Sequence, residues 1–342
     1  MNSLISKNSE PEITIPVENA GPGHCVAGAG AGAVLPSLAV GCILVPFDFS
    51  DVSAALVRRL VPLAERTGAV LHLLHVVENA DTWQPGSRAS ARRHEDPVVS
   101  VSKTMLDFWA RRTVQNRVPV HTSLRIGRPA ELIASRAASL KADLIVVATR
   151  GHRRVKQVFL GGTTEEVVRQ APCPVLAIPE RALHTLGPEC DGYPPSSWKR
   201  ILMPVEYSAA SRRALRHAAA IAIENRAQVH FIHVTSGQAS SSADIDDANR
   251  KSVSEEKNRL RQWLKAELRW PLDSLASVWT QTPPLYAILT EAKVFDADLI
   301  VLPVRSSGWA KRLRQGRLTD GILRHAPCPV LCLNAKPGTA LA

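Results

Sequence analysis

The chain contains two copies of one sequence pattern, and this repetition restricts the folds that it can adopt. The motif APCPVL occurs at Ala171–Leu176 and again at Ala326–Leu331, a separation of 155 residues (326 − 171). ADLIV recurs at the same separation, whereas LHLLHV and VHFIHV, which align His75 with His233, lie 158 residues apart (233 − 75). A deletion of three residues (158 − 155) reconciles the two separations. Self-similarity of this kind indicates two homologous units.

The repetition predicts two domains of about 140 residues each. We place the domains at residues 39–180 and 198–335, with a Pro/Gly/Ser-rich linker at 181–197. Residues 1–38 are expected to form a disordered N-terminal arm.

The pattern within each copy predicts an α/β fold, because near-continuous apolar strands alternate with helices. Each copy is expected to hold a five-stranded parallel sheet with helices on both faces. The strands expected in the first copy are 41–46, 69–77, 118–126, 143–149 and 174–178, with helices at 51–66, 100–116, 129–140 and 163–170. The strands expected in the second copy are 200–205, 228–234, 274–280, 298–304 and 329–333.

Neither a membrane span nor a secretory leader is expected. The apolar stretch Ala33–Val45 is shorter than the roughly 20 residues of a spanning helix, and Pro36 interrupts it. Glu10, Glu12 and Glu18 stand where a leader would be positively charged. The six cysteines form no CxxC pair, which favours buried thiols in a reducing compartment. The sequence therefore predicts a cytoplasmic protein without membrane contact.

The charge balance favours anionic partners. Lys and Arg number 42 against 31 Asp and Glu, a net charge of +11. Nucleotides, polyphosphates, nucleic acid and acidic lipid all suit such a balance. Aromatic residues make up only 5% of the chain and do not interleave with basic ones, which argues against a nucleic-acid binder.

The stretch after the fourth strand, GHRRVKQVFLGGTTEE, is the first candidate for a ligand site. Gly151 follows the strand and Gly161 precedes a helix, the place where open parallel sheets bind ligands and where helix N–H groups attract anions. The alternative is that the two glycines only end a strand and allow a turn, and their spacing alone leaves both interpretations open. Arg153, Arg154 and Lys156 lie in the same loop, either as solvated charge or as a means of steering phosphate.

These residues resemble the universal stress proteins of the UspA type, and the chain is similar to a tandem two-domain member. Nucleotide-binding members carry Gly, two residues, Gly, nine residues, Gly, then Ser or Thr. Here that run is Ala148, Gly151, Gly161 and Gly162, followed by Thr163. The departures are Ala148, which still permits close approach of a ligand, and Gly162, which removes a hydroxyl unless Thr163 or the Gly162 N–H substitutes for it.

The resemblance implies two Rossmann-like domains of the adenine nucleotide alpha hydrolase-like type, and a cofactor, ATP with or without Mg²⁺. It places the adenosine part of ATP near Asp48, whose carboxylate can accept hydrogen bonds from ribose hydroxyls, and assigns the reading of adenine to the backbone at Val76. The alternative for Asp48 alone is a helix cap near Ser50. The nucleotide-binding residues expected on this basis are Pro46, Asp48, Val76, Ala148, Gly151, His152, Gly161, Gly162 and Thr163.

The second copy departs further from the nucleotide-binding pattern. Its corresponding residues are Pro303, Ser306, Gly316 and Arg317, and Glu206 replaces Asp48. Proline lacks an N–H donor, and the guanidinium of Arg317 can fill an anion site by itself. We therefore expect the first domain to bind nucleotide and the second to be a pairing or regulatory partner.

Other chemistry has little support in the sequence. His72 with His75 and His230 with His233 have a spacing seen in metal sites on helices, but residues three apart on a strand point to opposite faces. We expect no metal site and no catalytic residues. The first function class is therefore a stress-response module that binds ATP and signals through protein contacts. The alternatives are a slow ATPase or adenylyl-transfer enzyme, and a protein-interaction module that binds no nucleotide.

Members of this family often pair at the edge of the fifth strand, here PVLAI at 174–178 and PVLCL at 329–333. A tandem chain can make this pairing internally, and a homodimer of such chains is also possible. The resemblance does not choose between the two arrangements.

Overall fold

A computed structural model describes residues 15–16, 40–78, 97–149, 162–184, 198–235, 245–268, 274–280, 282–304 and 317–334. The expected disordered arm, residues 1–38, lies outside these residues except for Ile15–Pro16. The expected linker, residues 181–197, lies outside them except for residues 181–184. No helix in the described parts of the chain is long and apolar enough to cross a membrane.

The predicted strands and helices are present in both repeats. The first repeat contains β2 (Cys42–Pro46), α1 (Asp51–Thr67), β3 (Val70–Val77), α2 (Pro97–Val114), β4 (Val120–Ile126), α3 (Pro129–Leu140), β5 (Leu144–Ala148), α4 (Gly162–Gln170), β6 (Val175–Ile178) and α5 (Glu180–His184). The second contains β7 (Arg200–Pro204), α6 (Ala209–Asn225), β8 (Gln228–Thr235), α7 (Ile245–Glu267), β9 (Ser274–Thr280), α8 (Pro284–Val294), β10 (Leu299–Val304), α10 (Arg317–His325) and β11 (Val330–Asn334). Two elements were not predicted, the short helix α5 and the two-residue strand β1 (Ile15–Pro16).

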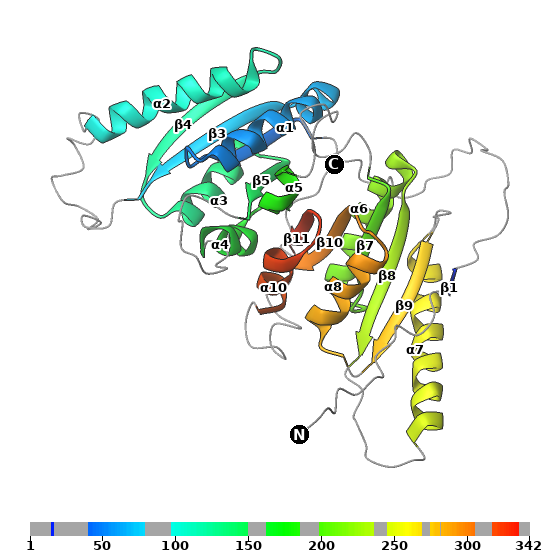
Figure 1. Ribbon diagram of the computed structural model, residues 1–342. Coiled ribbons are helices and arrows are strands. Elements are labelled where there is room, and N and C mark those ends of the chain that lie inside the picture. The colour runs from blue at the N-terminus through cyan, green and yellow to red at the C-terminus, as the bar shows by residue number, and fades with distance from the viewer. Residues whose placement is uncertain are drawn as a thin grey trace.

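The strands form one sheet that runs through both repeats (Figure 1). Its order is β1-β9-β8-β7-β10-β11-β6-β5-β2-β3-β4. Within each repeat the five strands are parallel. β1 adds an antiparallel pair at the β9 edge. The expected α/β class with parallel sheets is therefore confirmed.

The repeats join where β6 and β11 pair antiparallel, with Leu176 opposite Leu331. Side chains reinforce this junction on both sides. Asn334 Nδ2 donates to the carbonyl of Ala171 over 2.8 Å, and a terminal guanidinium nitrogen of Arg181 donates to the carbonyl of His325 over 2.7 Å. The chain thus makes the fifth-strand pairing internally, one of the two arrangements left open by the sequence.

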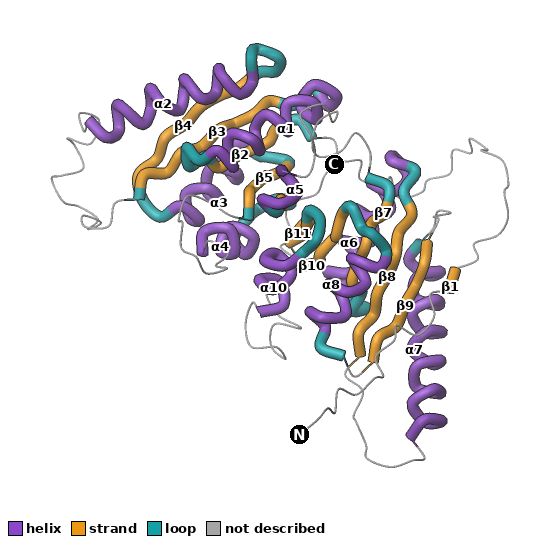
Figure 2. Tube along the Cα trace, viewed as in Figure 1, coloured by secondary structure: helices purple, strands orange, loops and turns teal. Residues whose placement is uncertain are grey.

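Helices cover both faces of the sheet and give three layers (Figure 2). One buried cluster packs α1, α2, α6 and α7 against one face, and a second packs α3, α4, α8 and α10 against the other. Neighbouring strand residues contribute to opposite clusters, as Val330 and Leu331 show. Burial on both faces explains why the strands read as continuous apolar runs. The thiols of Cys173, Cys328 and Cys332 are free and buried as predicted, whereas Cys42 is only half-buried.

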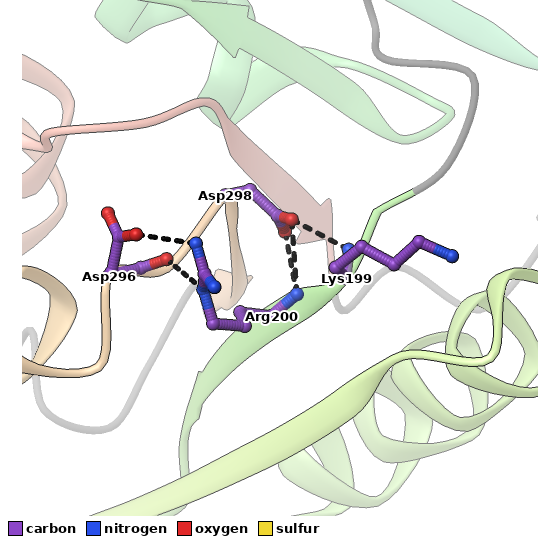
Figure 3. Close-up of polar contacts among 4 residues, drawn as sticks. All are labelled: Lys199, Arg200, Asp296 and Asp298. Carbon is purple, nitrogen blue, oxygen red and sulfur yellow. Dashed lines mark hydrogen bonds and ion pairs between the residues drawn. The ribbon is translucent and has the colours of Figure 1, made fainter.

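An aspartate fixes the amino ends of the two central strands in each repeat. In the second repeat the Asp298 carboxylate accepts from the backbone N–H of Lys199 (2.6 Å) and of Arg200 (3.0 Å), and the Arg200 side chain contacts Asp296 (Figure 3). In the first repeat, the Asp143 carboxylate accepts from the backbone N–H of Gly41 and of Cys42, both over 2.9 Å. These aspartates belong to the repeated ADLIV motif. The repetition of the aspartate is therefore explained by its role in holding the start of the neighbouring strand.

Candidate functional site

The candidate site lies where the order of strands reverses. In the first repeat the chain passes from β2 outward to β3 and β4, then returns to β5 on the other side of β2. β2 and β5 pair in parallel, so their carboxyl ends, Pro46 and Ala148, lie at the same edge of the sheet. Open α/β sheets bind ligands in the crevice at such a position.

Asp48 follows β2 at this edge and is held in place by the start of α1. Its Oδ1 accepts from the Ser50 N–H (3.1 Å) and from the Ser50 hydroxyl (2.6 Å). Ser50 is itself the N-cap of α1, because its Oγ accepts from the Ser53 N–H over 3.0 Å. Asp48 therefore supports the cap without being the cap residue. This contact orients the carboxylate, and a carboxylate can accept from several donors at once.

Phe49 and His75 anchor the loop that carries Asp48. Phe49 has a positive φ of 62°, an uncommon backbone state for a non-glycine residue. Its ring lies 4.2 Å from that of His75, and His75 Nδ1 donates to the Phe47 carbonyl over 2.7 Å. The Nδ1 atom must carry the proton, since a carbonyl only accepts. Sequence reasoning assigned His75 no role in the site, although its recurrence as His233 was a usable signal.

Val76 lies on the part of β3 that extends past the end of β2. The last pair between these strands is Pro46 with Leu74, whereas β3 continues to Val77. On its other side Val76 pairs with Arg125 of β4, and its side chain packs against the core cluster beneath α3 and α4. The side chain is thus occupied by packing, which leaves the backbone as the part of Val76 suited to read a ligand.

The end of β5 and the start of α4 also lie together. The Thr164 hydroxyl donates to the Ala148 carbonyl over 3.4 Å, a long contact that links the two elements across the intervening loop. Gly162 begins α4 and is exposed, and a Cβ added there would have no atom within 4 Å. Thr163 follows it and is half-buried. Of the other expected site residues, Gly151, His152 and Gly161 lie outside the described residues.

The corresponding corner of the second repeat has the same backbone but different side chains. Tyr207 replaces Phe49 with a positive φ of 55°, and Nδ1 of His233 donates to the Val205 carbonyl over 2.7 Å. The Arg259 guanidinium lies 4.9 Å from the Tyr207 ring and 3.3 Å from Glu256, which also approaches His233 at 3.7 Å. Burial is the main reason that the pKa of His233 is lowered. An acidic, aromatic and cationic cluster therefore fills this corner.

The second-repeat residues expected to weaken a nucleotide site are only partly described. Pro303 is buried within β10, where it pairs with Leu333. Arg317 begins α10. Ser306 and Gly316 lie outside the described residues. The proline thus sits in the strand itself, one residue before its end.

A buried chain of polar contacts in the second repeat has the connectivity of a hydrolase triad. His230 Nε2 lies 3.1 Å from the Ser277 hydroxyl and its Nδ1 lies 3.4 Å from Glu291, which accepts from Trp279 Nε1 over 2.8 Å. All four side chains are buried, so no substrate reaches the hydroxyl. Burial lowers the pKa of His230 to about 4 and raises the pKa of Glu291. We interpret the chain of contacts as a structural polar core.

Metal-binding clusters are also absent from the described part of the chain. No group of three or more His, Cys, Asp or Glu side chains there is arranged to hold a metal ion. His72 instead stacks near His121 at 5.1 Å between ring centroids. Burial is the first cause of the lowered pKa of His72, followed by the charge of His121.

Comparisons with known proteins identify the family of both repeats. The sequence model of the Universal stress protein family matches residues 41–179 and 197–334. A universal stress protein of Methanocaldococcus jannaschii is 29% identical over 144 residues, covering 40% of this chain and 80% of that protein. A universal stress protein of Thermus aquaticus is 33% identical over 139 residues, covering 40% of this chain and 96% of that protein.

Solved structures show the same architecture over nearly the whole chain. A universal stress protein from Archaeoglobus fulgidus superposes with a TM-score of 0.57 at 18% identity, covering 87% of this chain and 98% of the other. A structure from Pseudomonas aeruginosa described as a putative universal stress protein gives 0.52 at 18% identity, covering 87% of this chain and 94% of the other. At this level of identity the likeness concerns the fold alone.

Proposed function

Because the chain belongs to the universal stress protein family, we propose that it is a stress-response protein whose first repeat binds an adenine nucleotide. The nucleotide is ATP, with or without Mg²⁺, and it lies at the carboxyl ends of β2, β3 and β5. The protein with bound nucleotide and the protein without it make different contacts with other proteins. The observation that carries the proposal is the placement of Asp48, Ala148 and Gly162 around the point of strand reversal.

At the adenosine end, Asp48 accepts hydrogen bonds from the ribose hydroxyls. The Ser50 contacts fix the direction of its carboxylate, so little conformational entropy is lost when the nucleotide binds. The anchored ring of Phe49 keeps the loop in the same position. The backbone at Val76, beyond the last β2 pair, reads the base edge.

At the phosphate end, the residues at the start of α4 are suited to an anion. The open space around Gly162 allows a phosphate to approach the backbone, and the first N–H groups of a helix attract negative charge. The Thr163 hydroxyl is a second donor, one residue further on. These features fit the triphosphate of ATP, and Mg²⁺ when bound would neutralise part of its charge.

Calorimetric titration of the full chain with ATP and AMP tests the proposal, after co-purified nucleotide has been removed. We expect one site per chain, and we expect Asp48→Ala to weaken ATP binding about tenfold, the effect of losing a charged hydrogen bond. The matched control is Glu206→Ala at the equivalent position of the second repeat, which should leave the affinity unchanged. Absence of ATP binding, or equal losses in the two variants, would contradict the proposal.

Turnover is the alternative to simple binding, and the same preparation distinguishes them. A slow ATPase or adenylyl-transfer enzyme needs a base or metal carboxylate beside the phosphates. Among the described residues at the start of α4, Gly162 and Thr163 offer neither, and the carboxyl group of Glu165 in the same turn is hydrogen-bonded to Asp320 of α10. We therefore expect ATP to remain intact during a prolonged incubation, and release of ADP or AMP abolished by Asp48→Ala would favour the enzyme.

A further inference from the structure

The outer face of α2 carries an apolar stripe that the fold does not bury. Four of its side chains are largely exposed: Val98 (58%), Val101 (57%), Met105 (41%) and Phe108 (55%). Their spacings of three, four and three residues place them on one side of the helix, as at the a and d positions of a coiled coil. The opposite side of α2 packs on the core through Leu106 and others. We call these four exposed residues the α2 outer face.

The second repeat contains a matched helix without such a stripe. α7 occupies the place of α2, and Leu106 and Trp109 align with Leu260 and Trp263 at a separation of 154 (260 − 106 and 263 − 109). The pairing of the strands supports this alignment, because Ser123 and Ser277, also 154 apart, lie opposite equivalent residues of β3 and β8. The two leucines are buried and the two tryptophans pack against the same core cluster. The inward faces of α2 and α7 are thus conserved between the repeats.

The outward faces differ at the same separation. Val101, Met105 and Phe108 correspond to Glu255, Arg259 and Gln262, and all three second-repeat residues are exposed. A helix in this position therefore packs on the sheet without an apolar outer face. Packing of a helix in this position therefore does not require the stripe, and contiguous exposed apolar residues of this kind mark interaction sites.

The charges on α2 restrict the partner of its outer face. Lys103, Arg111 and Arg112 are exposed, and the Arg112 guanidinium lies 5.9 Å from the Phe108 ring. The acid on α2, Asp107, accepts from the Thr122 hydroxyl of β4. The exposed charges of this helix are therefore basic, and so is the whole chain at +11. A second copy of the chain would bring like charges together, whereas an acidic partner would not.

We propose that the α2 outer face is a docking surface for an amphipathic helix of a partner protein, with acidic residues beside its apolar stripe. The partner helix lies along α2, buries Val101, Met105 and Phe108, and pairs its carboxylates with Arg111 and Arg112. Burial of the stripe provides the affinity and the charges determine the orientation of the partner. This inference is argued from exposure and charge on a helix at the outer end of the first repeat (Figure 1), and it does not rest on nucleotide binding.

Fluorescence anisotropy with a labelled probe tests the proposal on the full chain. The probe is a helix-stabilised peptide of about three heptads with Leu at positions a and d and Glu at positions e and g. A companion peptide carries Lys at e and g. We expect the Glu peptide to bind at least about tenfold more tightly than the Lys peptide, with an affinity that falls as salt is added.

The decisive variant exchanges the stripe for the residues of the second repeat, Val101→Glu, Met105→Arg and Phe108→Gln. Because α7 carries these residues at matched positions, this variant should fold, which its circular dichroism and melting curve will check. We expect it to lose at least about tenfold in affinity for the Glu peptide. The control, Gln262→Ala on α7, should bind as the unaltered chain does.

Three outcomes would overturn the proposal. The first is absence of binding by the Glu peptide, or binding that the triple variant leaves intact. The second is a concentration-dependent dimer in sedimentation that the triple variant abolishes, which would make a second copy the occupant. The third is stripe-dependent binding to phosphatidylserine vesicles with no preference for the Glu peptide, which would indicate a membrane surface.

Discussion

Leu176 of β6 lies directly opposite Leu331 of β11, and the two residues occupy the same position in their repeats. Their separation of 155 residues (331 − 176) equals that of the APCPVL motif to which both belong. The antiparallel junction is therefore centred on one residue and its own repeat equivalent. On either side of this centre a strand residue meets the repeat equivalent of the residue on the opposite side, as Val175 does with Cys332. A second pair of equivalent residues meets between the helices that flank the junction, and the first prediction concerns that pair.

Asp320 of α10 forms a side-chain hydrogen bond with Glu165 of α4, its equivalent 155 residues earlier (320 − 165). Burial and the neighbouring Glu165 raise the pKa of Asp320 to about 7, against smaller opposing effects of Arg324 and Arg169. Because this pKa exceeds the ordinary value of 3.8, the folded state holds more protons between these pH values. The contribution of Asp320 to stability is therefore present at low pH and lost as the pH rises towards 7.

Unfolding by urea at pH 5, 6, 7 and 8 measures this effect in the variant Asp320→Asn. We expect the free energy of unfolding of the variant, relative to the unaltered chain, to rise by about 1 kcal/mol across this range, after allowance for solvent screening. Glu224→Gln, an exposed position on α6, is the control and should show no such trend. A constant difference between Asp320→Asn and the unaltered chain would rule out the carboxyl pair as a pH-dependent contact.

The ends of α1 and α6 offer a second comparison between the repeats. Gly68 ends α1 with φ 68°, and Arg226 ends α6 with φ 51°, both left-handed. Glycine adopts this conformation without a Cβ penalty. We expect Arg226→Gly to stabilise the protein by roughly 0.5–1 kcal/mol and Gly68→Arg to destabilise it by a similar amount, both measured by thermal unfolding. Shifts of the same sign in the two variants would refute this explanation.

Glu291 is expected to be important for the stability of the second repeat. Its removal in Glu291→Ala leaves the indole N–H of Trp279 and the ring of His230 buried without this partner. We expect a loss of about 3 kcal/mol in the free energy of unfolding. Glu291→Gln retains an acceptor for Trp279 and should lose about 1 kcal/mol. Equal losses in the two variants would show that the carboxylate charge, and not the hydrogen bond, is what matters.

Gly162 provides a prediction in which affinity increases. Since a Cβ at this position meets no atom within 4 Å, a serine fits without rearrangement and restores the hydroxyl of the family pattern. We expect Gly162→Ser to tighten ATP binding about threefold to tenfold, the contribution of one hydrogen bond to phosphate. Gly162→Ala supplies the Cβ without the hydroxyl and should not tighten binding. If neither variant changes the affinity, the start of α4 does not contact the phosphates.

Much of the fold was predictable because its signals are local. The apolar runs that become β2 and β5 need only their own sequence, since burial on both faces excludes polar residues from such strands. The expected site residues Asp48 and Ala148 came from the family resemblance, and the structure has them at the carboxyl ends of β2 and β5. Their contact with a nucleotide stays a prediction.

Other features depended on contacts between distant parts of the chain. Ser50 and Phe49 orient Asp48 through backbone turns and through His75, which lies 26 residues beyond Phe49 (75 − 49). The aspartates of the ADLIV motif were visible in the sequence as a repeat. That they fix the strand ends could be seen only once the structure placed them beside the backbone N–H groups of Gly41 and Lys199.

The sequence by itself determined that there are two homologous units, through its repeated motifs, and where their strands and helices run. The positions of the strands and helices follow from the pattern of apolar residues, which each segment carries independently of the others. That the fifth strands are able to pair was implied only by the family resemblance. The tertiary structure decided that β6 and β11 pair within one chain. It also decided that Val101, Met105 and Phe108 face solvent, although an apolar residue on a helix is usually expected in the core. The physical reason is that edge pairing and exposure depend on which surfaces meet in space.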